Sequence, residues 1–282
     1  MEEFQRVTGK QVEEFLAYLV REEKSERTVE KYGRDVRAFC AFLPVGKAVE
    51  KERVLAYKEH LVKRYAPSSV NSMLAAVNSF LGFLGREDCR VKKLKIQRRA
   101  FCPADRELNR AEYLRLIQAA EATGRSRTSL LLQTLGSSGI RVSETSAITV
   151  EALRQGKAVI RLKGKIRTIL LPQKLCRKLL RYAKRQRIFS GPVFLTRNKR
   201  PMNRKEIWAA FKSLCSRAGV AAQKVFPHNL RHLFARTFYE ARHDIAKLAD
   251  VLGHSSIDTT RIYIVTSGEE HCRTLEQMHL LL

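Results

Sequence analysis

The sequence has no long apolar run, no paired cysteines and no excess of glycine or proline. No stretch approaches the roughly 18 apolar residues of a membrane-spanning helix, and the polar start, MEEFQRVTGK, is unlike a secretory signal. A cytoplasmic protein is therefore expected. The six cysteines include no CxxC pair and no metal-ligand spacing, which favours reduced thiols over disulfides or structural zinc. With 14 Gly and 7 Pro among 282 residues, a low-complexity polymer is excluded.

Acidic side chains are scarce relative to basic ones, with 28 Asp and Glu against 54 Lys and Arg. The resulting net charge of +26 opposes compaction through self-repulsion, and a polyanionic partner relieves that cost. Nucleic acid is the partner that this balance favours. An anionic membrane is a weaker candidate, because the chain has no lipidation motif and no separate basic amphipathic tail. RNA is also less favoured, since no aromatic-rich strand of the RNP type is visible.

The first third of the chain has the apolar spacing of a small helical domain. One apolar face runs from Val12 to Leu19, and a second helix is expected after the start signal at Ser25. A third is expected over about 50–64, and Pro67 opens a fourth. These patterns predict an all-α domain over residues 1–89.

A basic segment with weak periodicity follows this domain, and we interpret residues 90–106 as an interdomain linker. Two interpretations of it stay open: it lies along a phosphate backbone, or it is a solvated tether. The candidate backbone contacts are Lys92, Lys93, Lys95, Arg98 and Arg99.

Residues 107–282 are predicted to be mainly helical around one short β-rich stretch. Val159–Leu162 and Thr168–Leu171 have strand character and are joined by a basic turn over 163–167, which predicts a hairpin. Helices are expected to resume through 176–188, and a further short strand is expected at 193–196. The predicted fold class is mainly α with a small β-hairpin or sheet. Because this part carries most of the excess positive charge, chemistry is expected here.

Three short boxes in this part carry potentially reactive side chains. Arg141 follows a glycine-containing turn, and Pro227-His228-Asn-Leu-Arg231-His232 stands far downstream. Leu252-Gly-His254 comes next, and Tyr263 lies nine residues after that histidine. This order of boxes is similar to the active site of tyrosine recombinases and phage-type integrases. The resemblance covers the whole chain in outline, and its motifs are strong over 135–145 and 226–264.

The resemblance implies a helical core-binding (SAM-like) domain before an α+β catalytic domain, and it assigns roles to the boxes. Arg141 and Arg231 would clamp a phosphate, since guanidinium groups bind two phosphate oxygens and stay protonated. Tyr263 would be the nucleophile, and its phenol, with an ordinary pKa of about 10, needs activation. His228 would exchange the proton of that phenol. His254 would hydrogen-bond the phosphate.

The general acid of this family is a lysine in the hairpin turn, and Lys163 matches it best. Because the turn is about one residue shorter than the family pattern, Lys165 remains an alternative. Glu144 shares a helical face with Arg141 if a helix starts there, and is expected to orient an arginine or cap the backbone. His232 is expected to support the site by packing.

The implied activity is site-specific recombination of double-stranded DNA through a covalent 3′-phosphotyrosine and a Holliday junction, without metal, ATP or another cofactor. The alternatives are a type IB topoisomerase-like enzyme and a catalytically silent DNA-binding relative. Four cleavages per exchange imply a homotetramer on DNA, docked through an amphipathic C-terminal helix over 269–282, in a bacterial-type, nucleoid-associated protein. Target sequence, accessory proteins and the choice between chromosome-dimer resolution, phage integration and mobile-element integration stay open.

Overall fold

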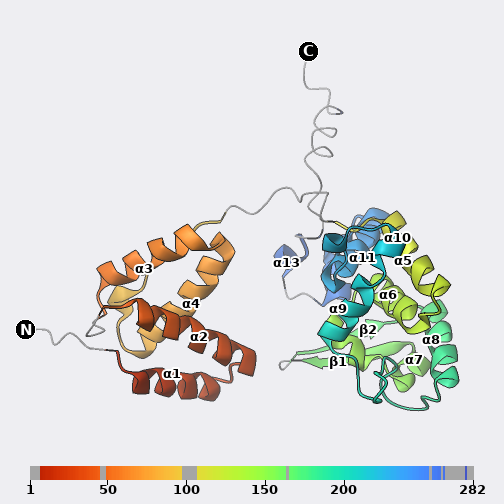
Figure 1. Ribbon diagram of the computed structural model, residues 1–282, viewed down its shortest axis with the longest axis horizontal. Helices are drawn as coiled ribbons and strands as arrows, with labels where there is room; N and C mark the ends of the chain where they lie inside the picture. Colours follow the sequence, from red (N-terminus) through yellow and green to blue (C-terminus); the bar gives the residue numbers. More distant parts are fainter. Residues whose placement is uncertain are drawn as a thin grey trace, which may run out of the picture. The chain divides into compact units, whose positions relative to one another are not determined.

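The computed structural model describes residues 7–44, 49–96, 107–162, 165–253, 256–261, 263 and 277. The chain divides into two compact units, Met1–Arg98 and Arg99–Leu282. Figure 1 shows that, among the described residues, the first contains helices without strands and the second combines helices with one hairpin. None of the described helices has both the length and the apolar character needed to span a bilayer.

The first unit contains the four helices that the apolar spacing predicts. They are α1 (Gly9–Arg21), α2 (Glu26–Phe42), α3 (Lys51–Arg64) and α4 (Pro67–Phe83), followed by a 3-10 turn, η1 (Glu87–Cys89). A capping box between Thr8 and Gln11 starts α1, and Pro67 occupies the first turn of α4. Phe15, Phe39 and Phe80 are fully buried at its centre, so the unit has its own core.

The basic segment after η1 is held against this unit by two asparagines of α4. The amide of Asn78 accepts from the Val91 N–H at 3.0 Å and donates to the Val91 carbonyl at 2.8 Å. Asn71, two turns earlier, pairs in the same way with Leu94 at 2.7 and 2.9 Å. Residues 90–96 of the expected linker are thus attached to the helical unit rather than extended in solvent. Residues 97–106 lie outside the described residues.

The second unit is built around α6, which contacts α5, α8, α9 and α11. Its elements are α5 (Arg110–Ala122), α6 (Ser126–Ser138), η3 (Val142–Ala147), α7 (Val150–Gln155), β1 (Lys157–Leu162), β2 (Lys165–Leu170), α8 (Gln173–Arg185), α9 (Arg204–Lys212), α10 (Cys215–Ala218), η4 (Ala222–Lys224), α11 (Pro227–Arg242), α12 (Ile245–Leu252) and α13 (Ile257–Arg261). The expected C-terminal helix at 269–282 falls almost wholly outside the described residues.

The hairpin forms with a shorter turn than the sequence predicts. β1 and β2 pair antiparallel from Lys157↔Leu170 to Leu162↔Lys165, so residues 165–167 are strand rather than turn. The further strand expected at 193–196 is wrong. The described structure has only isolated bridges there, Thr149↔Pro192 and Leu195↔Pro201. Each bridge has a proline as one partner, and proline lacks the N–H that would extend a ladder.

Candidate active site

Arg141 lies where α6 ends and the chain turns into η3. Gly139 terminates α6 in the left-handed conformation (φ +63°), and Arg141 is the N-cap of η3. Glu144 accepts from the Arg141 backbone N–H at 2.7 Å and from its Nη1 at 3.2 Å. The side chain of Arg141 is 42% exposed, whereas that of Glu144 is 2% exposed. The turn is therefore fixed from inside while the guanidinium remains accessible.

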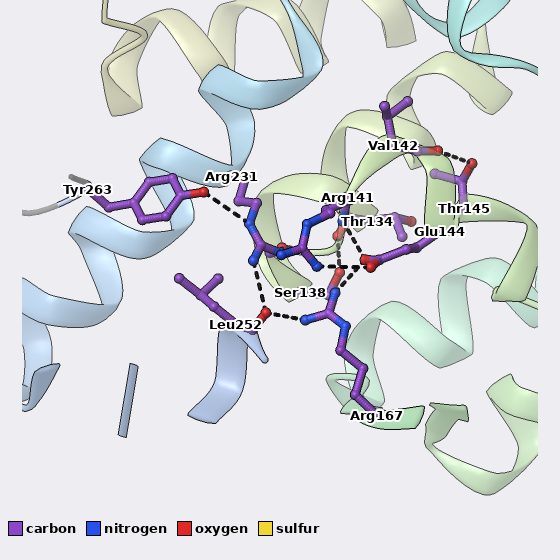
Figure 2. Close-up of polar contacts among 11 residues, drawn as sticks. Thr134, Ser138, Arg141, Val142, Glu144, Thr145, Arg167, Arg231, Leu252 and Tyr263 are labelled. Atoms are coloured by element: carbon purple, nitrogen blue, oxygen red, sulfur yellow. Dashed lines mark hydrogen bonds and ion pairs between the residues drawn. The ribbon is translucent and has the colours of Figure 1, made fainter. Parts of the chain in front are cut away.

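Arg231, in the first half of α11, is only 1% exposed and uses all three nitrogens. Its Nε donates to the phenol oxygen of Tyr263 at 3.4 Å, its Nη2 donates to the Leu252 carbonyl at 2.9 Å, and its Nη1 donates to the Gly139 carbonyl. Burial lowers the pKa of Arg231, and the Tyr263 hydroxyl opposes that shift. One guanidinium thus joins the ends of α6 and α12 to the residue carrying the phenol (Figure 2).

Tyr263 lies in the site of its own chain and is 4% exposed. Its ring belongs to a small apolar cluster with Ala235, Leu248 and Leu252. Its backbone N–H donates to the Thr260 carbonyl at 3.0 Å, which continues the turn after α13. The phenol that the sequence singles out is therefore placed against Arg231 within one chain.

Two histidines of α11 pack around the Tyr263 ring. The His232 ring centroid lies 4.5 Å from that of Tyr263 and 4.6 Å from that of His228, both edge to face. The centroids of His228 and Tyr263 are 5.9 Å apart. Burial lowers the pKa of His232 to about 4, and burial followed by the charge of Arg231 lowers the pKa of His228. Both rings are therefore mainly neutral at pH 7, and a neutral His228 is able to accept a proton.

Arg167 joins the site, although it belongs to none of the three sequence boxes. From β2 it donates through Nη2 to the Glu144 carboxylate and through Nη1 to the Leu252 carbonyl (Figure 2). The sequence feature that points to Arg167 is the alternation of a β-strand. Arg167 lies between exposed Ile166 and Thr168 and shares the inward face with buried Ile169. A turn over 163–167, as the sequence predicts, leaves Arg167 outside the strand and hides that alternation.

Comparison with known proteins identifies the group to which this arrangement belongs. Residues 106–270 match the model of the phage integrase family, and residues 12–88 match that of the phage integrase N-terminal SAM-like domain. The chain belongs to the phage integrase family.

Two curated relatives of this integrase-family chain extend over nearly its whole length. Tyrosine recombinase XerA of Pyrococcus furiosus is 29% identical over 280 residues, which cover 96% of this chain and 94% of the relative. Tyrosine recombinase XerC of Roseiflexus castenholzii is 30% identical over 280 residues, with 90% of this chain and 88% of the relative covered.

Solved structures resemble this integrase-family chain along its length as well. The crystal structure of XerA recombinase has 25% identity and a TM-score of 0.53, covering 98% of this chain and all of that one. A lambda integrase dimer bound to a core site has 16% identity and a TM-score of 0.71, covering 91% and 94%. The mainly helical fold with a small two-stranded sheet is thereby confirmed.

The structure brings together most, though not all, of the residues that this phage integrase family member was expected to use. Those placed around one point are Arg141, Glu144, His228, Arg231, His232 and Tyr263. His254 and Lys163 lie outside the described residues, and of Lys165 only the main chain is described, as the first residue of β2. On the first unit, Lys92, Lys93 and Lys95 are exposed, while Arg98 and Arg99 lie outside the described residues.

Proposed function

We propose that this phage integrase family member is a site-specific recombinase that cuts and rejoins duplex DNA through a 3′-phosphotyrosine bond at Tyr263. The observation that carries the proposal is the 3.4 Å contact between the phenol oxygen of Tyr263 and the buried Nε of Arg231. A phenol beside a guanidinium is the pairing that phosphoryl transfer to tyrosine needs. The names of the relatives, tyrosine recombinases XerA and XerC, support the same activity.

In this proposal the two arginines bind the scissile phosphate from different sides. Arg141 offers an exposed guanidinium, and the hydrogen bond from its backbone N–H to Glu144 fixes the main chain that carries it. Arg231 offers the Nε that contacts the phenol of Tyr263. As the Tyr263 oxygen bonds to phosphorus, negative charge grows on the non-bridging oxygens, and preorganised cations stabilise it. The bond from phosphorus to the 5′-oxygen then breaks, leaving a 3′-phosphotyrosine and a free 5′-hydroxyl.

Two proton transfers balance this step. His228, which its surroundings keep neutral, accepts the phenol proton directly or through one water. Lys163, or alternatively Lys165, gives a proton to the departing 5′-oxygen, and His254 hydrogen-bonds the phosphate. The 5′-hydroxyl of a partner strand reverses the chemistry and produces a Holliday junction. Because the phosphotyrosine bond retains the energy of the phosphodiester, no nucleotide cofactor is needed.

The proposed partners are double-stranded DNA and further copies of the chain. The net charge of +26 and the exposed lysines of the segment after η1, Lys92, Lys93 and Lys95, support contact with a phosphate backbone. Exchange requires four strand cleavages, which four protomers on DNA would provide. In this proposal the protomers dock on one another through residues 269–282.

Covalent capture from genomic DNA tests the proposal and finds the target site in the same experiment. Wild-type protein, Tyr263→Phe and the control Tyr239→Phe are mixed with fragmented DNA from the source genome and denatured, and protein-bound DNA is sequenced. Tyr239 lies on α11, near His243, and only its phenol oxygen is removed in the control.

Discrete adduct sites with wild type and Tyr239→Phe, but none with Tyr263→Phe, are expected. Equal adducts with all three proteins would place the nucleophile elsewhere. Tight DNA binding without adducts would indicate a silent binding protein. Adducts accompanied by plasmid relaxation but by no exchange between two sites would indicate a topoisomerase.

A further inference from the structure

Arg167 is a cation on the inward face of the hairpin. In the register of β1 and β2 it lies opposite Ile160, and Ile160 and the neighbouring inward residue Ile169 are both buried. Its side chain is 16% exposed. A cation in such surroundings is costly unless acceptors compensate it, so its contacts show what holds it there.

The first contact connects Arg167 to Arg141. Nη2 of Arg167 bonds the same Glu144 carboxylate that accepts from the backbone N–H and from Nη1 of Arg141. Glu144 is 2% exposed and has one negative charge for two guanidinium groups. The rotamer of Glu144, and with it the placement of Arg141, therefore depends on Arg167.

The second contact connects Arg167 to the end of α12. Nη1 of Arg167 and Nη2 of Arg231 both donate to the Leu252 carbonyl, which lies between the two guanidinium groups (Figure 2). Gly253 follows in the left-handed conformation (φ +64°), and an added Cβ there would lie 2.5 Å from Cδ of Arg167. The glycine before His254 thus serves both the helix end and the close approach of Arg167.

We propose that Arg167 is a positioning residue for strand cleavage. Arg167 holds the Glu144–Arg141 turn and the Leu252–Gly253 turn together. It thereby aligns Arg141 with Arg231, the two arginines of the phosphate clamp, and fixes the glycine that precedes His254. This inference rests on the proposed recombinase function. It assigns no contact between Arg167 and DNA, so loss of Arg167 should slow cleavage and leave DNA affinity nearly unchanged.

The test is single-turnover adduct formation at saturating protein on a nicked duplex that carries a site captured by the wild-type chain. Arg167→Gln removes the charge and keeps most of the side-chain length. Arg115→Gln is the control, because Arg115, although exposed, also donates to two distant carbonyls, of Ala218 at 3.0 Å and Gly219 at 3.4 Å. DNA affinity and thermal unfolding are measured on the same samples.

Arg167→Gln is expected to slow adduct formation about 100-fold, the scale of a small misplacement of reacting groups, with affinity within about 3-fold of wild type. Arg115→Gln should stay within about 3-fold in both. A rate for Arg167→Gln within about 3-fold of wild type, or a loss shared equally by Arg115→Gln, would overturn the inference.

A second substrate distinguishes misalignment of the clamp from general damage to the fold. Replacing one non-bridging oxygen of the scissile phosphate by an uncharged methyl group lowers the demand for positive charge. The ratio of wild-type rate to variant rate should shrink on this substrate for Arg167→Gln and for Arg141→Ala alike. An Arg167→Gln ratio that is equally large on both substrates would contradict a role through the clamp. If wild-type protein forms no adducts anywhere, the proposed function itself fails, which is a different result.

Discussion

The Nε of Arg231 lies 3.4 Å from the phenol oxygen of Tyr263, and both side chains are almost completely buried. The other nitrogens of Arg231 donate to the carbonyls of Gly139 and Leu252. Arg231 therefore stabilises the fold as well as serving the proposed chemistry. A phosphate that binds Nε of Arg231 must share or replace the contact with the phenol, which brings phosphate and nucleophile to the same point.

Arg231→Lys should be costly, because one ammonium cannot reach three acceptors that lie in different directions. We expect the free energy of unfolding of the second unit to fall by about 2–4 kcal/mol and adduct formation to fall at least about 100-fold. Urea denaturation and covalent capture measure the two effects. Arg236→Lys, on the same helix with a partly exposed partner in Glu107, should cost under about 1 kcal/mol. Equal losses in both variants would refute the special role of Arg231.

His232 should make the second unit sensitive to acid. Its pKa is about 4 in the folded chain against an ordinary 6.5, so between these values the unfolded chain binds more protons. The stabilisation is complete above about pH 6.5 and is lost as the pH falls towards 4, by up to about 3 kcal/mol. His232→Phe should flatten this acid limb in denaturation experiments at pH 7 and 4.5. The control is His243→Asn, at an exposed helix end, and it should keep the wild-type profile. Identical profiles for wild type and His232→Phe would refute the assignment.

Two glycines with similar backbone angles should respond differently to alanine. Gly156 (φ +69°) has open space around it, so Gly156→Ala should cost only the left-handed strain of about 1–2 kcal/mol. At Gly139 (φ +63°) an added Cβ would lie 2.3 Å from Cδ1 of Phe234, which adds about 1–3 kcal/mol of overpacking. Thermal unfolding of the two variants measures the difference. Gly139→Ala should also lose adduct formation, because its carbonyl accepts from Arg231. Equal stability of both variants would show that the Phe234 ring moves away from the added Cβ without an energetic cost.

Residues 90–96 should be released from α4 when the side chains of Asn71 and Asn78 are removed. Asn71→Ala with Asn78→Ala removes the four hydrogen bonds to Val91 and Leu94, and should cost about 2–4 kcal/mol at roughly 0.5–1 kcal/mol per bond. Trypsin should then cut faster after Lys92 and Lys93. Ser68→Ala, an exposed substitution at the start of the same helix, serves as the control. Unchanged cleavage at both lysines would mean that other contacts hold the segment.

The choice between Lys163 and Lys165 is open to a chemical test. A duplex with sulfur in place of the scissile 5′-oxygen has a leaving group that needs no proton, because a thiol is far more acidic than an alcohol. Alanine in place of the lysine that acts as general acid should slow cleavage of the oxygen substrate about 100-fold relative to wild type. The same variant should cleave the sulfur substrate at nearly the wild-type rate. The other variant should lack this rescue. Rescue of neither variant, or full activity of the double variant on oxygen, would remove both lysines from this role.

Much of the architecture follows from local sequence signals. The four helices of the first unit were predicted because apolar spacing and helix-start residues act over a few neighbouring positions. The hairpin is predicted for the same reason, although the predicted turn over 163–167 is too long, because Arg167 takes an inward position at which an apolar residue is expected. The strand expected at 193–196 failed because pairing depends on a partner strand, which its own residues do not reveal.

For the site, the sequence by itself determined which side chains are suited to phosphoryl transfer and in what order they occur. Only the tertiary structure decided how they meet: Arg231 reaches Tyr263, and the Leu252 carbonyl is shared by Arg231 and Arg167. The contacts of Arg231 alone join residues between 21 and 92 positions apart, from two helix ends and a turn. The motifs and their spacing indicate which reactive residue types are present and in what order. Burial, hydrogen-bond geometry and pKa shifts arise only when distant elements pack together.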